Sequence, residues 1–111
     1  MSYSVALAGS TERAVVCAQA LLDSENFELD WVLTPEPKKI GREQKLKPNL
    51  VHQLARSLEI PALLVEKEID QEIKSGVKTL EKPDFLLVVD FGYLIPDWLL
   101  KWPHQVALNI H

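Results

Sequence analysis

The chain has 111 residues, 47% of them hydrophobic and 25% charged, and its 12 basic and 16 acidic side chains give a formal net charge of −4. This composition predicts one globular domain and excludes a disordered chain, a collagen and a disulfide scaffold. The single cysteine, Cys17, excludes an internal disulfide and is typical of a reducing cytoplasm. No apolar run is long enough to span a membrane, and the N-terminus lacks the pattern of a signal peptide.

Short apolar runs predict the strands of the fold. Three runs, at residues 4–8, 29–34 and 85–90, predict buried strands, and residues 60–65 and 105–110 are two further candidates. None alternates cleanly between apolar and polar residues, which is typical of parallel strands covered on both faces.

Helical patterns lie between these strands. Apolar residues recur at spacings of three and four over residues 14–22, 50–58 and 69–80. Ser10 or Thr11 can cap the first of these helices. Residues 96–102 predict a short fourth helix, on which Trp98 and Trp102 are spaced i and i+4. The alternation of strands and helices predicts an α/β domain over residues 1–111, with right-handed crossovers and a mainly parallel sheet.

Basic side chains are concentrated between residues 35 and 48, where the sequence predicts a long irregular loop of about 14 residues. Residues 38–47 carry five basic side chains and one acidic side chain, a local charge of 5 − 1 = +4. The basic side chains are those of Lys38, Lys39, Arg42, Lys45 and Lys47. Two interpretations stay open: a solvated loop, or an arm that contacts phosphate groups with salt-sensitive affinity.

Several common cofactor and metal patterns are missing. The positions of the four glycines allow neither G-x-G-x-x-G nor a P-loop. Residues 8–11 form a turn that could bind an anion at a helix N-terminus, or an ordinary strand-to-helix turn. The three histidines lie on three different predicted elements without paired spacing, so we expect no metal site.

Candidate chemical groups follow the last two predicted strands. Asn109 and His111 share one face of the final strand, at its carboxyl end, where open α/β sheets bind ligands. An amide donor beside a histidine could stabilise an oxyanion in acyl transfer, but both could also be ordinary strand-end residues. Gly92 allows a tight turn or a close approach by a ligand. Phe91, Tyr93, Leu94 and Ile95 could wall a flat apolar ligand or only cap the core.

Four short motifs occur in the order in which one enzyme family carries them. Residues 8–11 (AGST) are similar to A-G-T-P, and residues 41–51 (GREQKLKPNLV) to G-R-x-x-K-L-x-P-x-x-V. Residues 88–96 (VVDFGYLIP) are similar to V-V-A-Y-G-x-I-L-P, and residues 108–111 (LNIH) to I-N-x-H. The chain therefore resembles the N-terminal part of the catalytic, folate-binding domain of methionyl-tRNA formyltransferases, as far as the N-x-H motif.

The resemblance implies a fold, a reaction and a set of site residues. The fold is a Rossmann-like three-layer domain with a sheet of about five strands, incomplete relative to the family. The reaction moves a formyl group from 10-formyltetrahydrofolate to the amino group of initiator methionyl-tRNA in translation initiation, without a metal. Asn109 and His111 would be catalytic, and Arg42 and Lys45 would contact tRNA. The folate pocket would be lined by Asp90, Phe91, Gly92, Tyr93, Leu94 and Ile95.

The chain also departs from the family. Asp90 stands where a small apolar residue is usual, and Phe91 replaces the usual tyrosine. The family continues beyond N-x-H to a catalytic aspartate and a C-terminal domain. We therefore expect a fragment or a naturally short form that is inactive alone. We also expect it to self-associate through an apolar surface on its last strand, at Val106, Leu108 and Ile110.

Two other functions stay open. The chain could belong to a formyltransferase that acts on a sugar-nucleotide amine or on glycinamide ribonucleotide, because these enzymes share the fold and the N-x-H motif. It could instead be a non-catalytic binding module. The basic segment at residues 41–48 favours the tRNA enzyme over the other formyltransferases.

Overall fold

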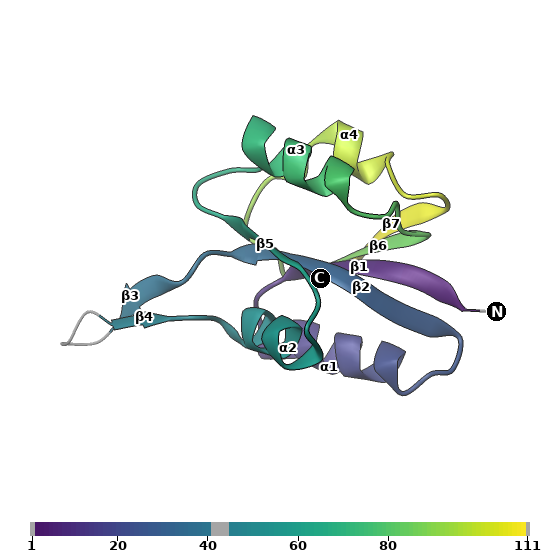
Figure 1. Cartoon of the computed structure of the whole chain (residues 1–111), viewed down its shortest axis with the longest axis horizontal. Helices are drawn as coiled ribbons and strands as arrows, with labels where there is room; N and C mark the ends of the chain where they lie inside the picture. Colours follow the sequence, from purple (N-terminus) through teal and green to yellow (C-terminus); the bar gives the residue numbers. More distant parts are fainter. Residues whose placement is uncertain (1, 41–44, 111) are drawn as a thin grey trace.

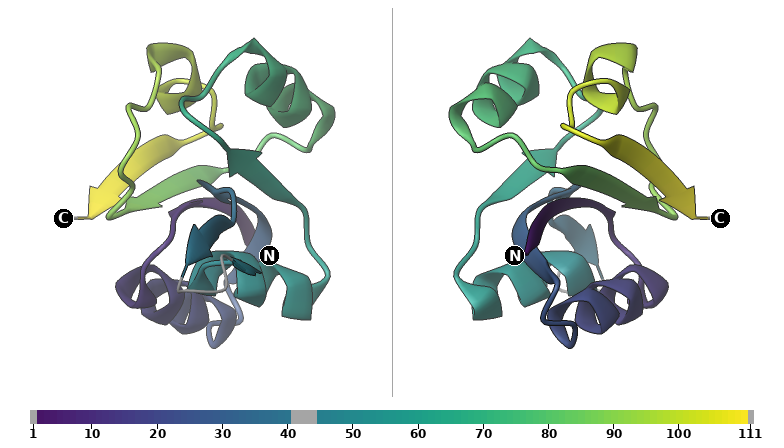
Figure 2. Two further views of the ribbon diagram at one scale, coloured as in Figure 1. Left: turned by 90° about the vertical axis from the view of Figure 1, so that its left-hand side faces the viewer. Right: turned by 90° about the vertical axis from the view of Figure 1, so that its right-hand side faces the viewer.

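The computed structural model is a three-layer α/β domain, which confirms the predicted fold class (Figure 1). It describes residues 2–40 and 45–110, and of residues 39, 40 and 45 it describes the backbone alone. A five-stranded sheet forms the middle layer, with α1 and α2 on one face and α3 and α4 on the other (Figure 2).

All five strands of this sheet are parallel, and their order is β5-β2-β1-β6-β7. They are β1 (Tyr3–Gly9), β2 (Phe27–Pro35), β5 (Ala62–Val65), β6 (Phe85–Val89) and β7 (Val106–Ile110), which confirms the five predicted strands. The chain first builds outward from β1 to β2 and β5, and then returns to place β6 on the other side of β1. The sheet therefore has a topological switch point between β1 and β6.

Apolar side chains fill both faces of the sheet. On the face covered by α1 and α2, Leu7, Val32 and Val89 pack with small helical residues such as Ala14 and Ala18. On the opposite face, a larger cluster surrounds Trp31, which is 1% exposed. Because both faces are covered, the central strands read as continuous apolar runs rather than as an alternation.

The helices begin at polar caps. They are α1 (Glu12–Leu22), α2 (Leu50–Leu58), α3 (Gln71–Thr79) and α4 (Asp97–Leu100). Thr11 caps α1 by accepting a hydrogen bond from the Ala14 amide at 3.2 Å, which decides between the two predicted caps. Asn49 and Asp70 cap α2 and α3 in the same way.

The prediction of the fourth helix was wrong in its length. Helix α4 ends at Leu100, so Trp98 and Trp102 do not share a helix. Trp102 instead packs against Trp31, with ring centroids 6.4 Å apart. The chain leaves the helix because Pro103, which is buried, cannot continue it and restricts the residue before it.

The prediction of an irregular loop at residues 35–48 was also wrong. Strands β3 (Lys38–Ile40) and β4 (Lys45–Lys47) form a two-stranded antiparallel ribbon that projects from the body of the domain (Figure 1). Lys38 pairs with Lys47 in its register. Charged side chains mask the short β pattern in the sequence, since a ribbon that projects into solvent needs no apolar face.

The last strand exposes one apolar face, as its alternation predicted. Val106, Leu108 and Ile110 are 45%, 50% and 37% exposed. Ala107 points to the other face, where it packs against the core cluster beside α4, and Asn109 shares that face.

We predict that Gly9→Ala destabilises the domain by about 1–3 kcal/mol, the usual cost of overpacking. A Cβ atom at Gly9 would lie 2.8 Å from Ala14 Cβ and 2.8 Å from the backbone oxygen of Val89, so the backbone must shift. Gly92→Ala is the matched control, because a Cβ atom there meets no atom within 4 Å. Urea unfolding followed by tryptophan fluorescence measures both, and equal losses would contradict the tight fit at Gly9.

Candidate functional site

The pairing of β6 with β7 brings the two predicted site segments together. Asn109 lies opposite Val88, and Ile110 lies opposite Val89. The backbone N–H of Asp90, the first residue after β6, donates to the carbonyl oxygen of Ile110 at 3.4 Å. Both segments therefore lie at the carboxyl edge of the sheet, where parallel α/β sheets bind ligands.

A cavity of about 330 Å³ opens at this edge. Asn109, Val88 and Leu100 line it. Five of the six predicted pocket residues also line it, namely Asp90, Phe91, Tyr93, Leu94 and Ile95. Its volume is at the lower end of the range for small-molecule sites, about 300–1,000 Å³. Gly92 lies in the same loop but does not line the cavity, and it has no close neighbour that would require glycine.

The cavity combines an aromatic wall with an amide. The rings of Phe91 and Tyr93 lie 5.4 Å apart and are tilted by 49°, and both side chains also pack against the core cluster around Trp31. The Tyr93 hydroxyl donates a long hydrogen bond of 3.5 Å to the backbone oxygen of Glu66. Leu94, by contrast, is 90% exposed. The wall can therefore stack on a flat ring, while the Asn109 amide can donate to an oxygen.

The carboxylate of Asp90 joins this cavity to the turn after β1. Its Oδ2 accepts from the Thr11 hydroxyl at 3.3 Å and lies 3.5 Å from Arg13 Nε. The sequence singled out Asp90 and Thr11 separately but not their contact, and it did not single out Arg13. Residues 79 positions apart give no local signal of contact, and only the switch point between β1 and β6 brings them together.

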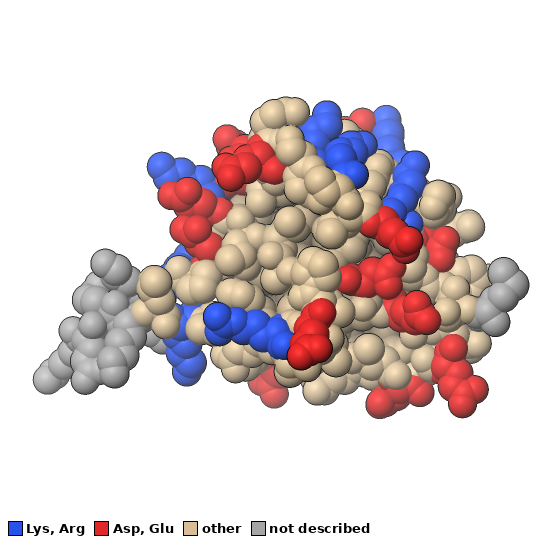
Figure 3. Space-filling view, viewed as in Figure 1, with Lys and Arg blue, Asp and Glu red and all other residues tan. Residues whose placement is uncertain are grey.

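Two predicted site residues, His111 and Arg42, lie outside the described residues. The backbone of Lys45 lies in β4, opposite Ile40 of the ribbon. Lys38 and Lys47 of the ribbon have exposed side chains, and Figure 3 shows basic side chains at the base of this projection. The ribbon follows the carboxyl end of β2, so it leaves the sheet at the same edge as the cavity.

The chain has curated relatives over almost its whole length. A methionyl-tRNA formyltransferase of Clostridioides difficile (strain 630) is 36% identical over 103 residues, which cover 93% of this chain and 33% of the relative. Methionyl-tRNA formyltransferases of Pseudomonas fluorescens (strain Pf-5) and Dichelobacter nodosus are 35% and 33% identical over 96% and 94% of the chain. The chain is related to the methionyl-tRNA formyltransferases.

The relationship covers only part of those enzymes. The chain spans about a third of the length of the curated relatives that it matches: 33% of the C. difficile protein and 32% of the D. nodosus protein. No protein-family model matches the chain. Within residues 2–40 and 45–110, no helix has the length and apolar character to cross a membrane, and no three His, Cys, Asp or Glu side chains are grouped to hold a metal.

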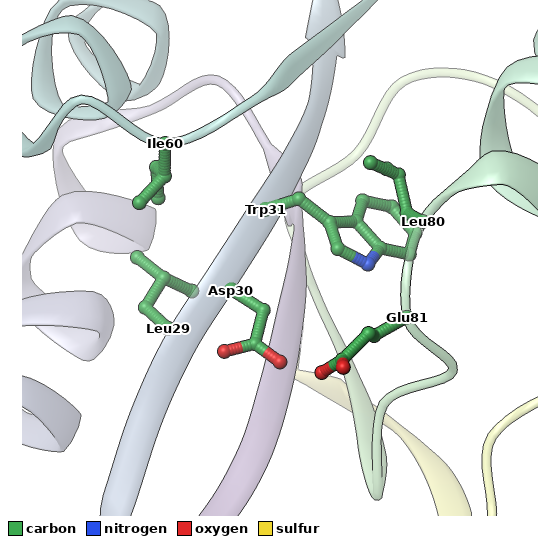
Figure 4. A pocket seen from close by; sticks show the side chains of 6 residues that line it. All are labelled: Leu29, Asp30, Trp31, Ile60, Leu80 and Glu81. Atoms are coloured by element: carbon green, nitrogen blue, oxygen red, sulfur yellow. The ribbon is translucent and has the colours of Figure 1, made fainter.

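A second cavity lies away from the segments that resemble formyltransferases. It has a volume of about 260 Å³ and is lined by Leu29, Asp30, Trp31, Ile60, Leu80 and Glu81. Figure 4 shows the carboxylates of Asp30 and Glu81 on the same side of the Trp31 ring. Burial raises the pKa of the Asp30 carboxyl, and the nearby carboxylates of Glu28, Glu81 and Asp84 raise it further. This cavity therefore carries unfavourable negative charge and none of the predicted site residues.

We predict that Asp30→Asn stabilises the domain at neutral pH. Because folding raises the pKa of Asp30, the unfolded chain ionises first as the pH rises from about 3.9, the ordinary value for aspartate. The advantage of the variant should therefore grow from that pH up to the pKa of the folded state and stay constant above it. Thermal unfolding between pH 3 and pH 8 measures this, with Glu25→Gln as a control for the change in net charge. An advantage that does not depend on pH would contradict the prediction.

Proposed function

We propose that the chain forms the formyl-donor site of a cytoplasmic methionyl-tRNA formyltransferase. The enzyme would transfer the formyl group of 10-formyltetrahydrofolate to the amino group of methionine on initiator tRNA. One observation carries the proposal: Asn109 and the loop at residues 90–95 line a single cavity in a chain whose relatives are methionyl-tRNA formyltransferases. Because the match covers 33% of the C. difficile relative, this chain would supply one part of such an enzyme.

The cavity suits the proposed donor. The donor carries a flat pterin ring, and Phe91 and Tyr93 offer two aromatic faces in van der Waals reach of the cavity. Leu94 and Ile95 extend the apolar wall, so the ring would be held mainly by contact area. The reactive formyl group would then lie toward Asn109, the one amide side chain among the described lining residues.

The proposed chemistry needs a donor for a developing oxyanion. The methionyl amine attacks the formyl carbon, and the carbonyl oxygen becomes negative in a tetrahedral intermediate. The bond from that carbon to the folate nitrogen then breaks, and the proton lost by the amine passes to that nitrogen. The Asn109 N–H groups would stabilise the oxyanion, and His111 would assist the proton transfer.

We predict that Asn109→Ala lowers kcat by about 10²–10³-fold with little change in KM, the usual effect of removing one oxyanion donor. The measurement is steady-state formyl transfer by the protein that contains this chain, with charged initiator tRNA as the acceptor. Leu108→Ala is the control, because Leu108 is on the same strand but faces away from the cavity. An unchanged kcat in Asn109→Ala would remove this residue from its proposed role.

The basic ribbon is proposed as the contact to tRNA. Residues 38–47 carry a local charge of +4 in a chain whose net charge is −4, so the remaining residues sum to −8. The ribbon projects from the body of the domain (Figure 1), and its Lys38 and Lys47 side chains are exposed and can reach a polyanion. Basic side chains that neutralise phosphates release counterions, so such binding weakens as salt rises.

We predict that Arg42→Ala and Lys45→Ala each flatten the dependence of log Kd for tRNA on log salt by about one unit. Affinity for the folate donor should not change, because the donor is proposed to bind at residues 90–95 and Asn109. Lys82→Ala is the matched control, since it removes one exposed basic charge between α3 and β6. If Arg42→Ala and Lys45→Ala both keep the wild-type slope, the basic segment at residues 38–47 is solvated surface only.

Self-association stays a prediction. The exposed Val106, Leu108 and Ile110 lie on the outermost strand of the sheet, where unpaired strand edges and apolar patches favour association.

A further inference from the structure

Asp90 holds an unusual backbone conformation. Its φ angle is 50°, in the left-handed region, which few non-glycine residues adopt. Gly92, two residues later in the same loop, could adopt this region without cost, but its φ angle does not lie there. The loop therefore places a strained aspartate, and not its glycine, at the carboxyl end of β6. Backbone strain of this kind persists where the surrounding contacts fix the residue.

Three contacts fix Asp90. Its backbone N–H donates to the Ile110 carbonyl, and its Oδ2 contacts both the Thr11 hydroxyl and Arg13 Nε. Both side-chain contacts use the same oxygen, and the described residues give Oδ1 no partner. The side chain is 31% exposed, so this second oxygen is not sealed in the core. The contacts with Thr11 and Arg13 thus leave Oδ1 available to a ligand.

Asp90 is also the one charged residue among the described residues that line the cavity. A carboxylate only accepts hydrogen bonds, and bonds to a charged acceptor are stronger than neutral ones. It therefore favours a ligand edge that carries N–H groups and disfavours one that carries oxygen lone pairs. The neighbouring Phe91 and Tyr93 favour a flat ring.

We propose that Asp90 is a specificity-determining residue that accepts N–H groups from the edge of a flat, donor-bearing ring stacked in this cavity. The inference rests on the proposed function, because a pterin is such a ring: its 2-amino group and adjacent ring N–H are both donors. Arg13 and Thr11 are positioning residues that hold the carboxylate through Oδ2. Asp90 would thus select the ring edge, at a position where the resemblance leads us to expect a small apolar residue.

The test compares two rings that differ at one position. Pterin carries an amino group at position 2, and lumazine carries a carbonyl oxygen there. Fluorescence titrations of each ring at neutral pH would give Kd values for the wild-type chain, Asp90→Asn and Arg13→Gln, with urea unfolding as a check that each variant folds. Tetrahydrofolate binding to the wild type, by calorimetry, reports separately on the proposed donor site.

We expect the wild type to bind pterin at least ten-fold more tightly than lumazine. Asp90→Asn should abolish or reverse this preference, because the asparagine amide can donate to the lumazine oxygen. Arg13→Gln should keep the preference, because the carboxylate remains, but it should weaken pterin binding, because Thr11 alone then holds that carboxylate. A preference for pterin that is unchanged in Asp90→Asn, or lost equally in both variants, would overturn the inference about Asp90. If the wild type still binds tetrahydrofolate in that case, the proposed donor site is upheld. No binding of either ring or of tetrahydrofolate would overturn both.

Discussion

The parallel pairing of β6 with β7 is the constraint on which the candidate site depends. It sets Asn109 opposite Val88 and brings Ile110 within hydrogen-bond reach of the Asp90 amide. A register shifted by one residue would turn Asn109 away from the cavity and present an apolar side chain in its place. The exposed apolar residues of β7 and the polar residue on its other face are thus two consequences of one register.

The switch point between β1 and β6 adds the second layer of the site. Gly9 ends β1 against the backbone of Val89, so the turn that follows it passes close to the end of β6. Thr11 then serves two purposes: it caps α1 and it donates to Asp90. Through these contacts, helix α1 fixes a carboxylate beside an aromatic wall that belongs to a different part of the chain. The close fit at Gly9 therefore supports the stability of the fold and the geometry of the cavity together.

Much of this arrangement could be predicted from the sequence. The five apolar runs correspond to the five parallel strands of the sheet. Asn109 lies beside the loop at residues 90–95 because neighbouring parallel strands end at the same edge of a sheet. The ribbon was missed because Lys38, Lys45 and Lys47 hide short strands that have no apolar face. The Arg13–Asp90 contact was missed because it depends on strand order, which local patterns do not encode. The i, i+4 spacing of Trp98 and Trp102 predicts a longer fourth helix than the structure has, because spacing alone does not take Pro103 into account.

The proposed function requires that the carboxyl edge of β6 and β7 binds the formyl donor. Titration of the ¹⁵N-labelled chain with tetrahydrofolate, followed by backbone amide chemical shifts, tests this claim directly. The largest changes in chemical shift should fall at residues 88–95 and 109, with smaller changes at Thr11 and Arg13. Changes concentrated instead at residues 29–31 and 80–81, around the cavity of Figure 4, would contradict it, as would the absence of any change.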